Sequence, residues 1–129
     1  MIKADQTVEY WLKCAEEDFK VMKHLYEKGD YHYSLFLGHL MLEKALKAVF
    51  VKKKNEHAPF THSLIFLAEK SGLKLSEQQT SLLEAVNQFN IEARYPDKKF
   101  EFYKLCTKDF ADSYITKIKD YYQWLLTQI

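Results

Sequence analysis

The chain has 129 residues, with 19 basic and 18 acidic side chains and a formal net charge of +1. That length suits one domain, residues 1–129, whose core needs no metal or disulfide to form. The near-zero charge argues against a protein that binds a polyanion through bulk charge. Two cysteines, Cys14 and Cys106, are too few for a disulfide framework and lack the spacing of a zinc site.

Membrane and secretion signals are absent from the sequence. The first seven residues carry charge without an apolar core, unlike a signal peptide. No window approaches the ~20 apolar residues of a membrane span. We therefore expect a soluble, cytoplasmic protein that makes no membrane contact. Three glycines and two prolines are far below ordinary usage, which predicts few turns and long helices.

Two long helices are predicted in the first half of the chain. From about Asp5 to Lys28, apolar residues recur at steps of three and four and so share one face. Gly29 ends this helix, and Asp30 can cap the next one. From about Tyr31 to Lys54, apolar residues leave almost no polar face. A helix of that kind is expected at the centre of the molecule.

Two more helices follow in the middle of the chain. Thr61 can cap a short helix over about residues 62–70, which Gly72 ends. Ser76 and Gln79 have the spacing of a capping box. That box predicts a fourth helix, which continues to about residue 93.

The chain breaks after this fourth helix. Pro96 disfavours helical geometry at Tyr95, and the last helix begins at about Thr107. No alternating strand pattern is present. The predicted fold is therefore all-α, an antiparallel up-and-down bundle of four long helices plus one short helix.

The central helix carries polar residues that a purely structural interpretation places with difficulty. His39 and Glu43 lie one turn apart on one stripe, and Glu43 and Lys47 have the favourable acid-before-base spacing. One interpretation is a helical ion pair among satisfied core groups. The other is a polar pocket inside the bundle, made of His39, Glu43, Lys44 or Lys47 and groups from elsewhere. We expect no metal, because nothing at metal-binding spacing completes a coordination shell.

The segment from Asn90 to Asp97 contains the single arginine, whereas the other 18 basic residues are lysines. In one interpretation Arg94 is structural and pairs with Asp97 or Glu92 near the helix end. In the other, the stiff turn at Pro96 positions the planar guanidinium of Arg94 to bind a phosphate or carboxylate through two hydrogen bonds. No Gly-rich phosphate loop or nucleophile elbow accompanies it, so ordinary nucleotide hydrolysis is unsupported.

In order and spacing these motifs resemble the HEPN family, the higher eukaryotes and prokaryotes nucleotide-binding domain, over most of the chain. The residues that carry the resemblance are Trp11, Ala15, Asp18, Gly29-Asp30-Tyr31, Phe36, His39, Glu43-Lys44-Ala45-Leu46-Lys47-Ala48, Thr61-His62-Ser63-Leu64, Asn90 and Arg94-Tyr95-Pro96-Asp97. The resemblance implies a helical bundle that homodimerises. It also implies frequent partnership with a minimal nucleotidyltransferase in a toxin–antitoxin system. We expect no cofactor.

Many HEPN proteins are metal-independent RNA endonucleases that use an arginine and a following histidine. Arg94 matches that arginine, but Lys99, Phe100 and Glu101 occupy the positions where the histidine would fall. The departure favours a module that binds a nucleotide, RNA or a partner protein without cutting RNA. The ligand-binding candidates are Arg94, Tyr95, Asp97, His39, Glu43, Lys47 and His62. Two alternatives are a ribonuclease toxin in which His39 or His62 works with Arg94, and a structural dimer without a ligand.

Overall fold

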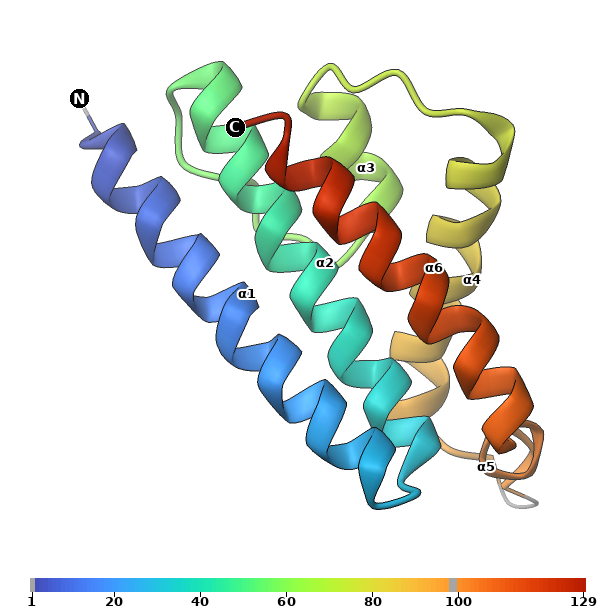
Figure 1. Cartoon of the computed structure of the whole chain (residues 1–129). Coiled ribbons are helices and arrows are strands. Elements are labelled where there is room, and N and C mark those ends of the chain that lie inside the picture. The colour runs from blue at the N-terminus through green and yellow to red at the C-terminus, as the bar shows by residue number, and fades with distance from the viewer. Residues whose placement is uncertain (1, 98–99) are drawn as a thin grey trace.

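The computed structural model describes residues 2–97 and 100–129, and this part of the chain contains six helices and no strand. The helices are α1 (Ala4–Glu27), α2 (Tyr31–Lys54), α3 (Leu64–Lys70), α4 (Glu77–Arg94), α5 (Glu101–Leu105) and α6 (Lys108–Leu126) (Figure 1). The all-α prediction is confirmed. Figure 1 shows the four long helices, α1, α2, α4 and α6, running in alternating directions.

The centre of the bundle is α2, as its all-round apolar sequence predicts. It packs against α1, α3, α4 and α6, and Figure 1 shows it between α1 on one side and α4 on the other. A tight turn at Gly29, with φ of +83°, reverses the chain between α1 and α2. The fully buried core around α2 includes Met22, Leu35, Met41, Leu42, Leu46, Leu83, Ile118 and Leu125.

Three of the long helices meet at Gly38 in α2. A Cβ atom added to Gly38 would lie 2.9 Å from Cδ1 of Ile118 on α6 and 3.4 Å from Sδ of Met22 on α1. The missing side chain therefore lets α1 and α6 approach the same turn of α2. Glycine in a helix interior costs about 1 kcal/mol relative to alanine, and close packing offsets this cost here.

The start of α3 differs from the prediction. The helix begins at Leu64, and its cap is Ser63, whose hydroxyl accepts a hydrogen bond from the Phe66 N–H at 3.2 Å. Thr61, the predicted cap, instead accepts from the Ser63 N–H at 3.1 Å. Two hydroxyl residues so close together are both suitable caps, and the chain direction at the loop decides between them. Asp30 occupies the N-cap position of α2 without a side-chain capping bond.

The second half of the chain confirms the capping box and adds a helix. The Ser76 hydroxyl accepts from the Gln79 N–H at 3.1 Å, and the Gln79 side chain accepts from the Ser76 N–H at 3.0 Å. After the break at Tyr95, α5 was not predicted, so the bundle has two short helices instead of one. Five residues are too few for hydrophobic periodicity to be visible in a sequence.

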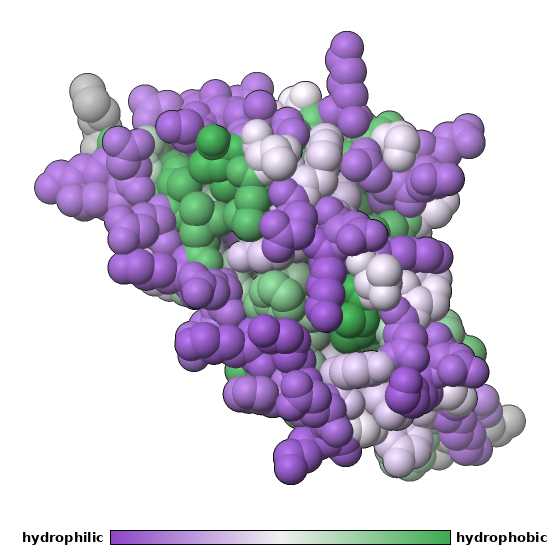
Figure 2. Space-filling model, viewed as in Figure 1, coloured by the Kyte–Doolittle hydropathy of each residue, from purple (hydrophilic) through white to green (hydrophobic). Residues whose placement is uncertain are grey.

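The surface is mostly polar on the face shown in Figure 2, and its broadest hydrophobic area lies where the N-terminal half of α1 meets the end of α2. In this region Val8, Ala48 and Val51 form a second, small buried cluster. Among the residues described, none of the helices combines the length and hydrophobicity that crossing a bilayer requires.

Candidate functional site

Four of the predicted site residues form one network, which we call the Glu43 network: Glu43, His39, Lys47 and His62. The Glu43 carboxylate is 5% exposed, yet each of its oxygens has a partner. Oε1 accepts a hydrogen bond from His62 Nδ1 at 2.8 Å, and Oε2 accepts one from Lys47 Nζ at 3.1 Å. Because buried charges are stable only when they are paired and hydrogen-bonded, the network holds its members in fixed positions.

The network joins three parts of the fold. His39, Glu43 and Lys47 are spaced by four residues and therefore lie on one stripe of α2, whereas His62 comes from the loop between α2 and α3. The Lys47 ammonium also lies 5.1 Å from the ring centre of Trp11 on α1. Lys44, the fourth candidate on α2, is not part of the network. Its Nζ forms an ion pair with Oδ2 of Asp18 on α1 at 2.6 Å.

His39 is fully buried and is neutral at pH 7, because burial lowers its pKa to about 4. Its Nε2 donates a hydrogen bond to the backbone carbonyl of His62 at 3.0 Å. The single proton of the neutral ring is thus on Nε2, and Nδ1 carries a lone pair. Nδ1 has no hydrogen-bond partner in the described part of the chain and faces Glu43 Oε1 at 4.0 Å. At neutral pH this contact is therefore not an ion pair.

Arg94 lies near the same stripe of α2, at the end of α4. Its guanidinium carbon lies 5.2 Å from the ring centre of Phe36, which precedes His39 by three residues. Its Nε donates a hydrogen bond of 2.7 Å to Oδ1 of Asn90, a buried residue one turn earlier in α4. The cation–π contact and this hydrogen bond orient the guanidinium. Phe36 and Asn90 belonged to the family resemblance, but only the structure shows that they position Arg94.

The carboxylates that a structural role for Arg94 would need are engaged elsewhere. Glu92 accepts a hydrogen bond from Gln88 Nε2 at 3.0 Å. Asp97 accepts from the Glu101 N–H at 2.9 Å, at the start of α5. Within residues 2–97 and 100–129, no Asp or Glu forms an ion pair with Arg94.

Tyr95 and Asp97, the remaining predicted site residues, do not join the Glu43 network. Tyr95 is 76% exposed. Asp97 lines a cavity of about 460 Å³, whose other walls include His32, Tyr33, Phe100, Phe102 and Tyr103. Lys99, one of the positions compared with the family's histidine, lies outside the described residues. No group of three or more His, Cys, Asp or Glu side chains in the described segments is arranged to hold a metal ion.

A helical bundle with a buried carboxylate–histidine network on its central helix, and an oriented arginine nearby, defines the class of this protein. The family model for the HEPN domain matches residues 8–128. The chain therefore belongs to the HEPN family.

Two solved structures share this fold. One is the crystal structure of TT1696 from Thermus thermophilus, with a TM-score of 0.78 and 14% identity, covering 95% of this chain and 98% of that one. The other is ST0689, described as an archaeal HEPN homologue, with a TM-score of 0.65 and 25% identity, covering 94% and 96%. No curated protein matches the sequence.

Proposed function

We propose that this HEPN domain is a binding and regulatory module in which Arg94 holds the phosphate of a nucleotide or of RNA. One observation carries the proposal: Asn90 and Phe36 orient the Arg94 guanidinium, yet no carboxylate of the described residues pairs with it. Because Nε is bonded to Asn90, the two Nη groups form the edge of the guanidinium that can bind a ligand. Two parallel N–H donors on that edge match the oxygens of a phosphate.

We further propose that the module is a homodimer that works with a minimal nucleotidyltransferase in a toxin–antitoxin-type system. Three large exposed apolar side chains stand close to the site residues along the chain: Phe60 precedes His62, and Ile91 and Tyr95 flank Arg94. Exposed apolar groups around a polar site are typical of a surface that another chain covers. They support the proposal that a partner chain covers the surface near Arg94 and His62.

Replacing Arg94 with lysine tests the phosphate contact. Arg94→Lys keeps the positive charge but loses the two-pronged donor geometry. We expect binding of AMP or of a short single-stranded RNA to weaken by about 1.5–3 kcal/mol, the range for a charge-assisted hydrogen bond. The melting temperature should hardly change. Isothermal titration and thermal melting measure the two effects.

The matched control is Lys13→Ala, which removes an exposed lysine from α1 and should leave binding unchanged. Unchanged affinity in Arg94→Lys with a clearly lower melting temperature would show that the arginine only clamps the turn at Pro96. If the wild-type protein bound neither AMP nor RNA, the structural dimer without a ligand would be the better description.

One observation favours the ribonuclease alternative enough to test it. Glu43 holds Nδ1 of His62, whose side chain is 53% exposed. A carboxylate that orients a histidine through Nδ1 leaves Nε2 to act as a general base. His39 has no such freedom, because it is buried and its Nε2 is bonded to a carbonyl.

Incubation with labelled RNA in the presence of a chelator tests this alternative. The binding-module proposal predicts that the wild-type protein cleaves no RNA. RNA cleavage by the wild-type protein that is lost in both Arg94→Lys and His62→Ala, but kept in His57→Ala, would show that the protein is a ribonuclease and not only a binding module. His57 is a suitable control because it is an exposed histidine of the same loop.

A further inference from the structure

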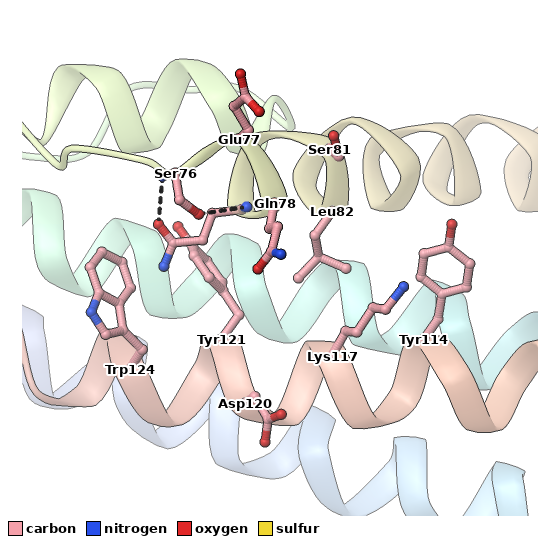
Figure 3. A pocket seen from close by; sticks show the side chains of 11 residues that line it. Ser76, Glu77, Gln78, Ser81, Leu82, Tyr114, Lys117, Asp120, Tyr121 and Trp124 are labelled. Atoms are coloured by element: carbon pink, nitrogen blue, oxygen red, sulfur yellow. Dashed lines mark hydrogen bonds between the residues drawn. The ribbon is translucent and has the colours of Figure 1, made fainter.

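A second cavity, of about 770 Å³, lies between the first turns of α4 and the face of α6 (Figure 3). Arg94 is at the other end of α4, and the 18 residues of that helix separate the two places by about 25 Å. The cavity has the size of a small-molecule site. Residues that line it and matter for its chemistry are Gln78, Leu82, Tyr114, Lys117, Tyr121 and Trp124.

The hydroxyl of Tyr121 has no partner in this cavity wall. Tyr121 is 3% exposed, and its hydroxyl oxygen makes no hydrogen bond with any described residue. Figure 3 shows its ring extending from α6 toward the first turn of α4. Burial raises the pKa of Tyr121, so the hydroxyl keeps its proton and is a donor at neutral pH. A buried hydroxyl without a partner is costly, and a polar ligand atom would remove that cost.

The other groups facing this space are polar without being acidic. In Figure 3 the Gln78 amide lies between α4 and α6, whereas the carboxylates of Glu77 and Asp120 turn away from it. The Trp124 ring stands 5.5 Å from the Tyr121 ring, which gives one end of the cavity an aromatic wall. At the other end the Lys117 ammonium lies 5.2 Å from the Tyr114 ring centre.

From these contacts we infer that the cavity binds an uncharged planar heterocycle of the chemical class of a nucleobase. The base stacks on Trp124, and its edge hydrogen-bonds with the Gln78 amide and the Tyr121 hydroxyl. A glutamine amide offers the adjacent donor and acceptor that base edges complement. Stacking on an aromatic side chain is how proteins hold an unpaired base. Lys117 supplies a positive charge beside the base for a linked phosphate.

Tryptophan fluorescence measures this binding directly. Trp11→Phe leaves Trp124 as the only tryptophan, and in that background we titrate the four uncharged ribonucleosides and a short single-stranded RNA. We expect saturable quenching by at least one nucleoside if the base binds as a free molecule. Quenching by the RNA alone would identify a base within a strand as the ligand.

The variant Tyr121→Phe separates ligand binding from a role in stability. It removes only the unpartnered hydroxyl, so the melting temperature should stay the same or rise, while affinity should fall about tenfold. Tyr122→Phe is the matched control, because Tyr122 is a neighbouring buried tyrosine outside the cavity lining. The uncharged nucleosides carry no phosphate for Arg94 to hold, so Arg94→Lys should leave their quenching unchanged, which separates the result from the test of the phosphate site.

Two outcomes would overturn the inference. One is the absence of saturable quenching with every nucleoside and with the RNA. The other is equal affinity in Tyr121→Phe and in the parent protein. Either result would mean that the Tyr121 hydroxyl has no part in binding a base.

Discussion

At the scale of single residues, His39 shows how burial sets protonation. The ring is enclosed between α2 and the loop that carries His62, and burial lowers its pKa to about 4, from an ordinary value of 6.5. Between about pH 6.5 and pH 4, His39 is therefore protonated in the unfolded chain but stays neutral in the folded protein. Stability that is fully present above pH 6.5 is lost as the pH falls through this range.

We expect the low pKa of His39 to reduce the free energy of unfolding by up to about 3 kcal/mol at pH 4, at about 1.4 kcal/mol per pH unit. His39→Gln keeps a donor for the His62 carbonyl but cannot titrate. Urea unfolding between pH 7 and pH 4 should show a steeper loss for the wild type. Glu43 and His62 face this position and are present in both proteins, so the comparison isolates the side chain at position 39. Parallel curves would contradict the assignment.

At the scale of helices, the contact of α2 with α1 and α6 depends on Gly38. Gly38→Ala places a methyl group 2.9 Å from Cδ1 of Ile118. Overpacking of this kind costs typically about 1–3 kcal/mol, against about 1 kcal/mol gained in helix propensity. We therefore expect a lower melting temperature for Gly38→Ala.

The double variant tests whether that contact is the cause. Ile118→Val removes the crowded Cδ1 atom, so Gly38→Ala should be less destabilising in the Ile118→Val background than alone. A double-mutant cycle with thermal or urea unfolding measures the difference. Additive effects of the two substitutions would show that the α1–α2–α6 crossing is not limited by this contact.

The helices were also the most predictable part of the molecule. The all-round apolar run of α2 identified the central helix, and the Ser76–Gln79 spacing identified the start of α4, because both signals are local in sequence. The choice of Ser63 over Thr61 as a cap depends on where the loop leads the chain. The short helix α5 has too little sequence for periodicity to be detected.

The candidate site was predictable only where its members share a helix. The spacing of His39, Glu43 and Lys47 gives their common stripe directly. That His62 completes the network, and that Lys44 turns instead to Asp18, depends on how the loop and α1 pack against α2. Side-chain partners from different elements have no signature in a single sequence.

At the scale of the whole molecule, we expect a homodimer in solution. Ile91, 50% exposed on α4 beside Arg94, belongs to the surface proposed for the partner. Ile91→Lys should shift the protein toward monomer in light scattering at micromolar concentration. Val21→Lys is the matched control, since Val21 is 40% exposed on α1, on the other side of α2 from α4 (Figure 1). A wild-type monomer, or equal effects of both variants, would contradict this surface.

The central claim is that Arg94 is held in place to bind an anion, and its own NMR signal tests this most directly. The chain contains one arginine, so the Nε–Hε group of Arg94 gives a unique resonance in ¹⁵N-labelled protein. We titrate AMP and a short single-stranded RNA and follow this signal. We expect a saturable shift of the Nε–Hε resonance and the appearance of slowly rotating Nη signals, because bidentate binding restrains the guanidinium. An Arg94 resonance that stays unmoved while the same ligand binds elsewhere on the protein would show that Arg94 does not hold the anion.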